Sequence, residues 1–212
     1  LMSNVLLFGA SGFLGQEVME KLIASGHQLT AITRSFNPEN SKKFRPDIDW
    51  VEADLYQADQ WKELLNDHTV VINLVGMVKE EPEKGLTYDK VILGAAKVIA
   101  DVMADKSDHH YIYVSTHLEG LATPEGYRKA KKEAEDYLLA QSFKTSIVRP
   151  SMMYGPGKAG TNERAQAILE KMDPASPAWA GRPIAVEKVA QTIANIVNGK
   201  TDQTIFENDD MA

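Results

Sequence analysis

The stretch Val5–Gly15 constrains the fold of this chain more than any other part of the sequence. It opens with an apolar run and continues into a turn in which glycine recurs at every third position, as Gly9, Gly12 and Gly15. The residues from 16 to 24 then carry apolar side chains at helical spacing. This pattern predicts a buried strand, a tight turn and an amphipathic helix, which together form the first unit of an α/β sheet.

The same turn has the composition of a phosphate-binding loop. Glycine lets the backbone approach a phosphate closely, and the unpaired N–H groups of the first helical turn favour negative charge. We therefore predict that the turn binds the pyrophosphate of a dinucleotide, although a turn that needs glycine for its shape alone is the alternative. The predicted contacts come from Gly9, Ser11, Gly12, Phe13, Leu14 and Gly15.

Composition argues against several other classes of function. The chain has no cysteine, which excludes disulfides and thiolate ligands and fits the reducing cytoplasm, where we expect the protein to act. The formal net charge of −7 disfavours nucleic acid as a partner. The longest apolar runs are shorter than the ~20 residues of a membrane-spanning helix, so no membrane insertion is expected. No metal site is predicted, because the adjacent His109 and His110 would point to opposite faces of a strand.

The tip of the second predicted strand bears on the choice of dinucleotide. Folds that prefer NAD usually place an acidic residue there, about 20 residues beyond the glycines. In this chain Arg34 follows the strand predicted over residues 28–33. A guanidinium can pair with a ribose 2′-phosphate through two hydrogen bonds, so the sequence favours NADP, with NAD as the second choice. The alternative is a solvated loop arginine.

Two further segments are expected at the cofactor edge of the sheet. Asp54 follows the third predicted strand. The second segment covers the end of the fourth predicted strand and the residues just after it: Asn73, Leu74, Val75 and Gly76. Ligands of a doubly wound sheet bind at the carboxyl ends of its strands, which places both segments beside the dinucleotide. Turn formation alone would also explain their composition.

The order of elements predicts an α/β fold of the Rossmann type, a doubly wound parallel sheet with helices on both faces. Helices are expected near residues 58–65 and within 84–106. Residues 2–150 are predicted to form the NAD(P)-binding domain. Residues 151–212 are predicted to form a short substrate or lid region, with two helices and a final strand at 204–206, integrated into effectively one domain.

Tyr127 and Lys131 lie four residues apart on a predicted helix and therefore share one face. Lys131 falls on the apolar stripe of that helix, and a buried lysine needs a partner, which a tyrosine hydroxyl and a cofactor ribose would supply. The alternative is a packing tyrosine beside a lysine that reaches the surface. The other charged residues of the helix are expected to face solvent: Arg128, Lys129, Lys132, Glu133, Glu135 and Asp136.

The pair has a chemical use. Tyrosine ordinarily loses its proton near pH ~10, and a nearby ammonium lowers that pKa, so Tyr127 is a candidate general acid or base. Ser115, at the end of the preceding strand, would hold a substrate carbonyl or alcohol against Tyr127. Ser115, Tyr127 and Lys131 are therefore the predicted catalytic residues.

Four motifs together resemble the short-chain dehydrogenase/reductase superfamily, in particular its extended and atypical branches related to NAD(P)-dependent epimerases and dehydratases. They are the glycine turn, Ser115, Tyr127-x-x-x-Lys131 and the segment Arg149-Pro150-Ser151-Met152-Met153-Tyr154-Gly155-Pro156. The resemblance implies hydride transfer at a nicotinamide, with Lys131 on the ribose. It also implies that Asp54 and Leu55 flank the adenine and that Pro150 lies along the cofactor.

The chain departs from the family pattern in two places. Many members carry an asparagine on the long fourth helix, and the register puts Val91 at that position, with Gly94 matching the family's glycine. The part of the chain after residue 151 is also short for a nucleotide-sugar domain. The missing asparagine leaves two alternatives at this point, namely reduced catalysis and no catalysis.

Three functions follow from these observations. The first is an NAD(P)-dependent oxidoreductase that transfers a hydride between the cofactor and a small carbonyl or alcohol substrate. The second is a nucleotide-binding redox sensor or assembly factor without turnover, and the third is an NAD-dependent epimerase or dehydratase of nucleotide sugars. A monomer and a homo-oligomer are both compatible with the sequence.

Overall fold

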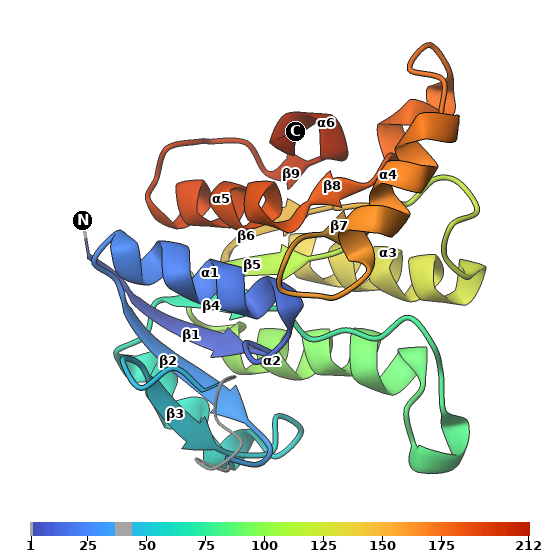
Figure 1. The fold of residues 1–212 in the computed structure, drawn as a ribbon. Coiled ribbons are helices and arrows are strands. Elements are labelled where there is room, and N and C mark those ends of the chain that lie inside the picture. Colours follow the sequence, from blue (N-terminus) through green and yellow to red (C-terminus); the bar gives the residue numbers. More distant parts are fainter. Residues whose placement is uncertain (1, 37–43) are drawn as a thin grey trace.

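The computed structural model describes residues 2–36 and 44–212, which form a seven-stranded parallel sheet (Figure 1). Its strand order is β3-β2-β1-β4-β5-β6-β9. Strands β2 and β3 are added on one side of β1 and the later strands on the other, so the topological switch point lies between β1 and β4, which are parallel like the rest. The predicted doubly wound sheet is thus confirmed. The strands are β1 (Asn4–Phe8), β2 (Gln28–Thr33), β3 (Asp49–Glu52), β4 (Val70–Asn73), β5 (His110–Val114), β6 (Lys144–Val148) and β9 (Ile205–Phe206).

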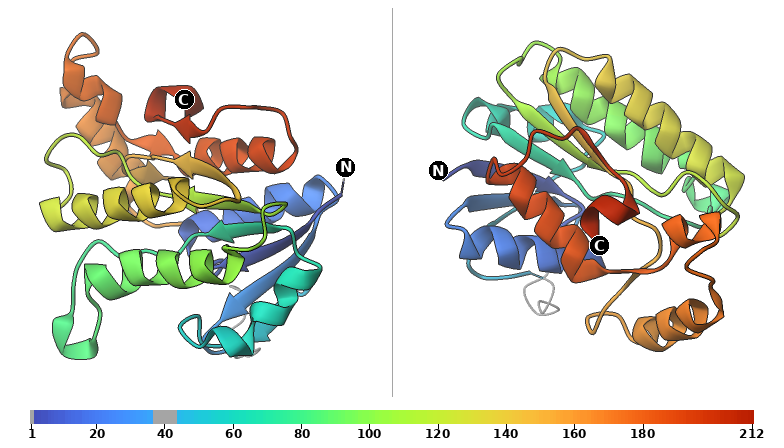
Figure 2. Two further views of the ribbon diagram at one scale, coloured as in Figure 1. Left: turned by 180° about the vertical axis from the view of Figure 1, so that it is seen from behind. Right: turned by 90° about the horizontal axis from the view of Figure 1, so that it is seen from above.

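Two pairs of helices cover the two faces of the sheet, as the two views of Figure 2 show. The side chains of β1 alternate between them: Val5 and Leu7 face one core, and Leu6 and Phe8 face the other. The first core is covered by α1 (Phe13–Ala24) and α5 (Val186–Val197), and the second by α2 (Ala95–Met103) and α3 (Glu125–Leu139). Every central strand is therefore buried on both sides, as parallel sheets require.

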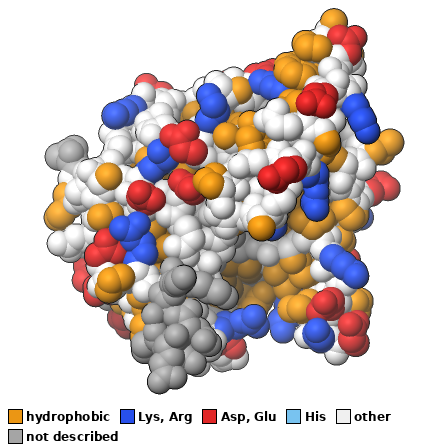
Figure 3. All heavy atoms as spheres, in the orientation of Figure 1, with side chains coloured by type: hydrophobic (Ala, Val, Ile, Leu, Met, Phe, Trp, Pro, Cys, Tyr) orange, Lys and Arg blue, Asp and Glu red, His pale blue; other side chains and the backbone are white. Residues whose placement is uncertain are grey.

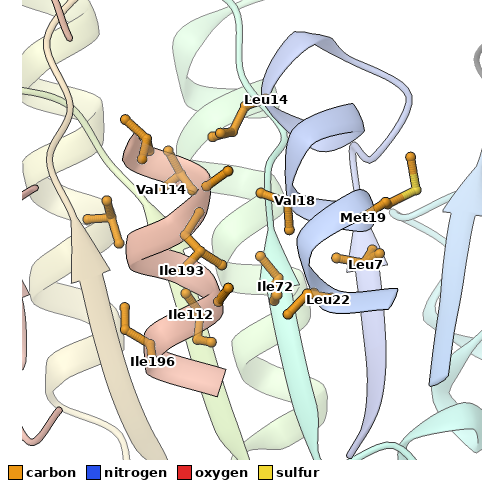
Figure 4. Close-up of a cluster of buried hydrophobic side chains, with 14 of the residues drawn as sticks. Leu7, Leu14, Val18, Met19, Leu22, Ile72, Ile112, Val114, Ile193 and Ile196 are labelled. Carbon is orange, nitrogen blue, oxygen red and sulfur yellow. The ribbon is translucent and has the colours of Figure 1, made fainter. Parts of the chain in front are cut away.

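The carboxyl-terminal residues contribute to the main core (Figure 4). Ile193 and Ile196 of α5 pack with Val18 and Leu22 of α1 over the sheet, and all four are 5% exposed or less. Strand β9 extends the sheet beyond β6. A smaller part stands over the carboxyl ends of the strands: β7 (Met153–Tyr154), α4 (Thr161–Lys171), η6 (Pro177–Gly181), β8 (Ile184–Ala185) and α6 (Asn208–Met211).

Two predicted helices differ from the structure. The segment expected as a helix near residues 58–65 forms two 3₁₀ helices, η2 (Ala58–Gln60) and η3 (Lys62–Asn66). The indole of Trp61, between them, is buried against Phe8 and donates to the carbonyl of Leu55. These tertiary contacts hold the segment as two short 3₁₀ helices instead of one α-helix. The long segment at 84–106 is divided into η4 (Pro82–Lys84), the π-helix η5 (Asp89–Gly94) and α2.

No helix within residues 2–36 and 44–212 has both the length and the apolar composition to cross a bilayer. In the same ranges, no three His, Asp or Glu side chains come together in a group that could hold a metal ion.

Candidate functional site

The three glycines at the junction of β1 and α1 are needed for different structural reasons. Gly9 has a φ of +77°, and a Cβ there would lie 2.8 Å from the backbone of Leu74 and Val75. A Cβ on Gly15 would lie 2.0 Å from the carbonyl oxygen of Ala10. A Cβ on Gly12 would meet nothing closer than 3.8 Å. Two glycines are thus explained by packing, whereas Gly12 is exposed and a Cβ there would make only an ordinary contact.

Helix α1 begins beside the exposed Gly12 without a side-chain cap. Gly12 is the N-cap residue, and no described side chain accepts a hydrogen bond from the first N–H groups of the helix. The first turn also carries no acidic residue. These N–H groups and the positive end of the helix dipole therefore favour an anion in front of Gly12, and the residues present fit a pyrophosphate.

The end of β4 is shaped by Asn73, whose side chain is almost fully buried. Its Nδ2 donates to the hydroxyl of Tyr111 at 3.0 Å, and its Oδ1 accepts from the backbone N–H of Val75 at 2.9 Å. The side chain of Asn73 thus holds the turn rather than facing the cofactor edge. Leu74, Val75 and Gly76 follow it on the partly exposed side of that edge.

Two cations lie near Tyr56, which follows β3: Arg34 at the end of β2 and Lys90 in η5. Arg34 is exposed and makes no ion pair with a described residue, and its charge counteracts the effect of burial, which raises the pKa of Tyr56. Nζ of Lys90, in η5, lies 5.2 Å from the centre of the same ring. Asp54 accepts from the N–H of Tyr56 and so stabilises the turn, and Leu55 is buried. Sequence reasoning missed Lys90, because only the fold brings it to this strand end.

Tyr127 and Lys131 lie on α3 as predicted, with the lysine buried to 3% exposure. The Lys131 ammonium donates to the carbonyl of Val114 at 2.8 Å and lies 5.8 Å from the centre of the Tyr127 ring. Burial lowers the pKa of Lys131 to about 8, although the charge of Glu135 opposes this effect. A Cβ on Gly76 would lie 3.8 Å from the same Nζ, so the ammonium reaches the cofactor edge.

The hydroxyl beside Tyr127 belongs to Thr116 rather than to Ser115. The side chain of Thr116 lowers the pKa of Tyr127, but burial has the larger effect and raises this pKa above its ordinary value. The predicted direction for this pKa was wrong, because the ammonium of Lys131 is directed to Val114. Ser115 Oγ donates instead to Glu135 at 2.5 Å.

Glu135 was predicted to face solvent, and that prediction was wrong: its side chain is 0% exposed. Arg149 approaches it with two nitrogens, Nε at 3.0 Å and Nη2 at 2.5 Å, and binds Glu207 through Nη1 at 2.6 Å. Glu135 follows Lys131 by four residues, so the helical spacing that selected the buried lysine also selects this carboxylate.

The segment after β6 lies against the glycine turn. Pro150 is buried, and its carbonyl accepts from the N–H of His117 at 3.0 Å. Cβ atoms on Gly155 and Gly157 would each lie 3.3 Å from the ring of Phe13, the first residue of α1. The motif that follows β6 and the motif that follows β1 are therefore packed together by this ring.

The position of the family asparagine lies in the π-helix η5, where Val91 is half-buried. The wider turn carries the Asp89 carbonyl close to Gly94, where a Cβ would lie 2.9 Å away. The glycine thus has a structural reason, while Val91 has no side-chain group that could donate or accept a hydrogen bond.

Two open regions adjoin these residues. Figure 3 shows a hollow with an apolar floor and basic side chains at its rim, where Figure 1 draws α2 and the chain leading to it from β4. A separate cavity of about 310 Å³ lies at the ends of β5, β6 and β9. The Nδ1 atom of His117, which lines this cavity, is buried and has no described partner.

Comparison with known proteins agrees with this geometry. The model of a family described as NAD(P)H-binding matches residues 9–200. MIOREX complex component 2 of Saccharomyces cerevisiae is 26% identical over 73% of this chain and 74% of its own length. The mitochondrial 40 kDa subunit of NADH-ubiquinone oxidoreductase from Neurospora crassa is 26% identical over 70% of this chain and 40% of its own length.

The fold is shared with a solved enzyme. The structure of the Bordetella bronchiseptica enzyme WbmH in complex with NAD+ superposes with a TM-score of 0.68 and 17% identity, covering 94% of this chain and 73% of that one. The family match spans the glycine turn, Tyr127 and Lys131. The chain therefore belongs to the NAD(P)H-binding family.

Proposed function

We propose that this protein is an NADP-dependent oxidoreductase that acts on a small carbonyl or alcohol. The observation that carries the proposal is the arrangement of Tyr127, which stands beside the buried ammonium of Lys131 and is acted on by the side chain of Thr116. A cofactor-binding protein without chemistry has no need for a tyrosine held in this way. Bound NADPH supplies the hydride.

Each side chain has a role in moving the proton. Tyr127 donates its hydroxyl proton to the substrate oxygen in reduction and accepts it in oxidation. Lys131 binds the ribose and stabilises the phenolate that forms. Thr116 orients the substrate oxygen, a role that we transfer from Ser115 because the Ser115 hydroxyl is held by Glu135. The substrate is small, in keeping with the cavity of about 310 Å³ at the neighbouring strand ends.

The preference for NADP rests on the charges around Tyr56. Arg34 is exposed and free of ion pairs with described residues, and the ammonium of Lys90 lies 5.2 Å from the centre of the Tyr56 ring. Two cations at the adenosine end of the cleft favour a ribose carrying a 2′-phosphate. The unpaired N–H groups of the first turn of α1, which follow Gly12, would hold the pyrophosphate.

The test is NADPH oxidation with a broad panel of aldehydes and ketones. We expect turnover with at least one class, a loss of about 100-fold or more in Tyr127→Phe, and a larger loss in Thr116→Val than in Ser115→Ala. Thermal unfolding of each variant serves as the control for folding. Protein that binds NADPH but turns over no member of the panel, or a Tyr127→Phe variant as active as the parent, would contradict the proposal.

A second candidate function is a nucleotide-binding component of a protein complex. Val91 supports it, since the family's amide side chain is missing there, and so do relatives that are named as parts of complexes. Capture of a partner that depends on NADPH but is unchanged in Tyr127→Phe would favour this function. The nucleotide-sugar alternative has support from the shared fold alone. The cytoplasmic location stays a prediction, because the Neurospora crassa relative is named as mitochondrial.

A further inference from the structure

Four charged side chains form a row from the proposed site to the carboxyl-terminal segment. The row alternates in sign: the buried Lys131, the buried Glu135, Arg149 and the half-exposed Glu207. The two cations and two carboxylates balance. Glu135 is its centre, because it accepts from both Arg149 and Ser115 and acts electrostatically on Lys131.

The surroundings of Lys131 offer it little other support. From β5 it meets the Val114 carbonyl and the ring of Tyr113, whose centre is 5.0 Å from Nζ, and from α3 it meets Tyr127. Both tyrosines are neutral at ordinary pH, because burial raises their pKa values. Glu135 is the carboxylate of the described chain that acts on the buried ammonium. An ammonium without such a charge is costly to bury.

We propose that Glu135 is a positioning residue of the active site, which keeps the Lys131 ammonium charged and fixes the end of β5 through Ser115. This inference rests on the proposed function for the use of Lys131, but not for the state of its charge. Arg149 prevents Glu135 from being an unpaired buried carboxylate, and Glu207 completes the balance from the carboxyl-terminal segment. The integrity of the site thus depends on a residue that touches no ligand.

The pKa of Lys131 shows why the countercharge matters. With Glu135 in place, burial lowers this pKa to about 8, so the side chain is charged below that pH and loses its proton as the pH rises through it. Without the carboxylate the pKa of Lys131 falls further, so a larger share of the protein carries a neutral lysine at neutral pH. A neutral lysine cannot stabilise a phenolate.

The experiment measures this pKa directly in the full chain. Protein labelled with ¹³C at the lysine ε-carbon is titrated by NMR, and the Lys131 signal is identified by its loss in Lys131→Met. We expect the midpoint to fall by about one pH unit or more in Glu135→Gln. It should rise in Arg149→Gln, which leaves the Glu135 carboxylate to Lys131. Glu133→Gln removes an exposed charge from the same helix and should change nothing.

The outcomes separate this proposal from the proposed function. A Lys131 midpoint unchanged in folded Glu135→Gln overturns the inference, and so does a fall in Arg149→Gln. If Glu135→Gln does not fold, the sign of the shift in Arg149→Gln decides. NADPH binding, followed by fluorescence, should lose affinity at a lower pH in Glu135→Gln than in the parent. A parent that shows no NADPH binding contradicts the proposed function but leaves the titration result valid.

Discussion

The two edges of the proposed site are built in different ways. At the glycine-turn edge, where β1, β2 and β4 end, the decisive contacts join backbone atoms, such as those that a Cβ on Gly9 or Gly15 would meet. At the α3 edge, where β5 and β6 end, they join charged side chains far apart in sequence, such as Arg149 and Glu207. The first kind of contact needs one residue type at a fixed spacing, whereas the second needs only a partner somewhere in the fold.

The largest effect is expected from a pair of substitutions at the glycine-turn edge. Gly15→Ala puts a methyl group 2.0 Å from the Ala10 carbonyl, and we expect a loss of about 3 kcal/mol in the free energy of unfolding. Gly12→Ala meets no atom closer than 3.8 Å, so stability should change by at most about 0.5 kcal/mol. NADPH affinity should nevertheless fall by about tenfold or more in Gly12→Ala, because the methyl group occupies the place of the pyrophosphate.

Urea unfolding and NADPH fluorescence titration measure the two quantities on the same preparations. The pair distinguishes packing from binding at adjacent glycines. If Gly12→Ala bound NADPH as tightly as the parent, the start of α1 at Gly12 would not be the pyrophosphate site. The backbone contacts at the glycine-turn edge would then serve packing alone.

A smaller effect is expected at the tip of β2. Arg34→Ala should weaken NADPH binding by about tenfold to a hundredfold, or roughly 1.4–2.7 kcal/mol, and leave NADH binding unchanged, because only NADPH carries the 2′-phosphate. Arg45→Ala is a matched control, since Arg45 is already paired with Asp47 at 2.9 Å. Equal losses for both dinucleotides would show that Arg34 does not read the phosphate.

Sequence reasoning succeeded where local rules decide. The apolar run Val5–Phe8, together with the glycine spacing and the helical spacing of the apolar residues after it, was enough to predict the first strand, turn and helix. It failed at the helix near residues 58–65, because the buried indole of Trp61 overrides the local helical pattern through a tertiary contact.

The site divides in the same manner. The sequence placed Tyr127 and Lys131 on one face of a helix, and the structure has them so. It chose Ser115 instead of Thr116, since a strand end shows both hydroxyls but not the face that each will meet. Glu135 looked like a surface residue because its partner Arg149 lies on another element, and the burial of an ion pair depends on both members.

The smallest effect concerns another contact between distant residues. His110, at the start of β5, has its Nε2 atom 2.7 Å from the hydroxyl of Ser146 on β6. Burial and the charge of Lys144 lower the pKa of His110 to about 4. In the unfolded chain the imidazole binds a proton near pH ~6.5, so the stability that it contributes above that pH is lost as the pH falls toward 4.

We therefore expect the parent to lose about 1 kcal/mol of unfolding free energy through His110 between pH 7 and pH 5.5. His110→Gln cannot titrate and should show a correspondingly smaller loss over the same interval, measured by urea unfolding at both pH values. The carboxylates of the two proteins are the same, so their contributions cancel in the difference. Parallel losses would mean that the imidazole is protonated in the folded chain as easily as in the unfolded one, and that this distant contact does not hold it neutral.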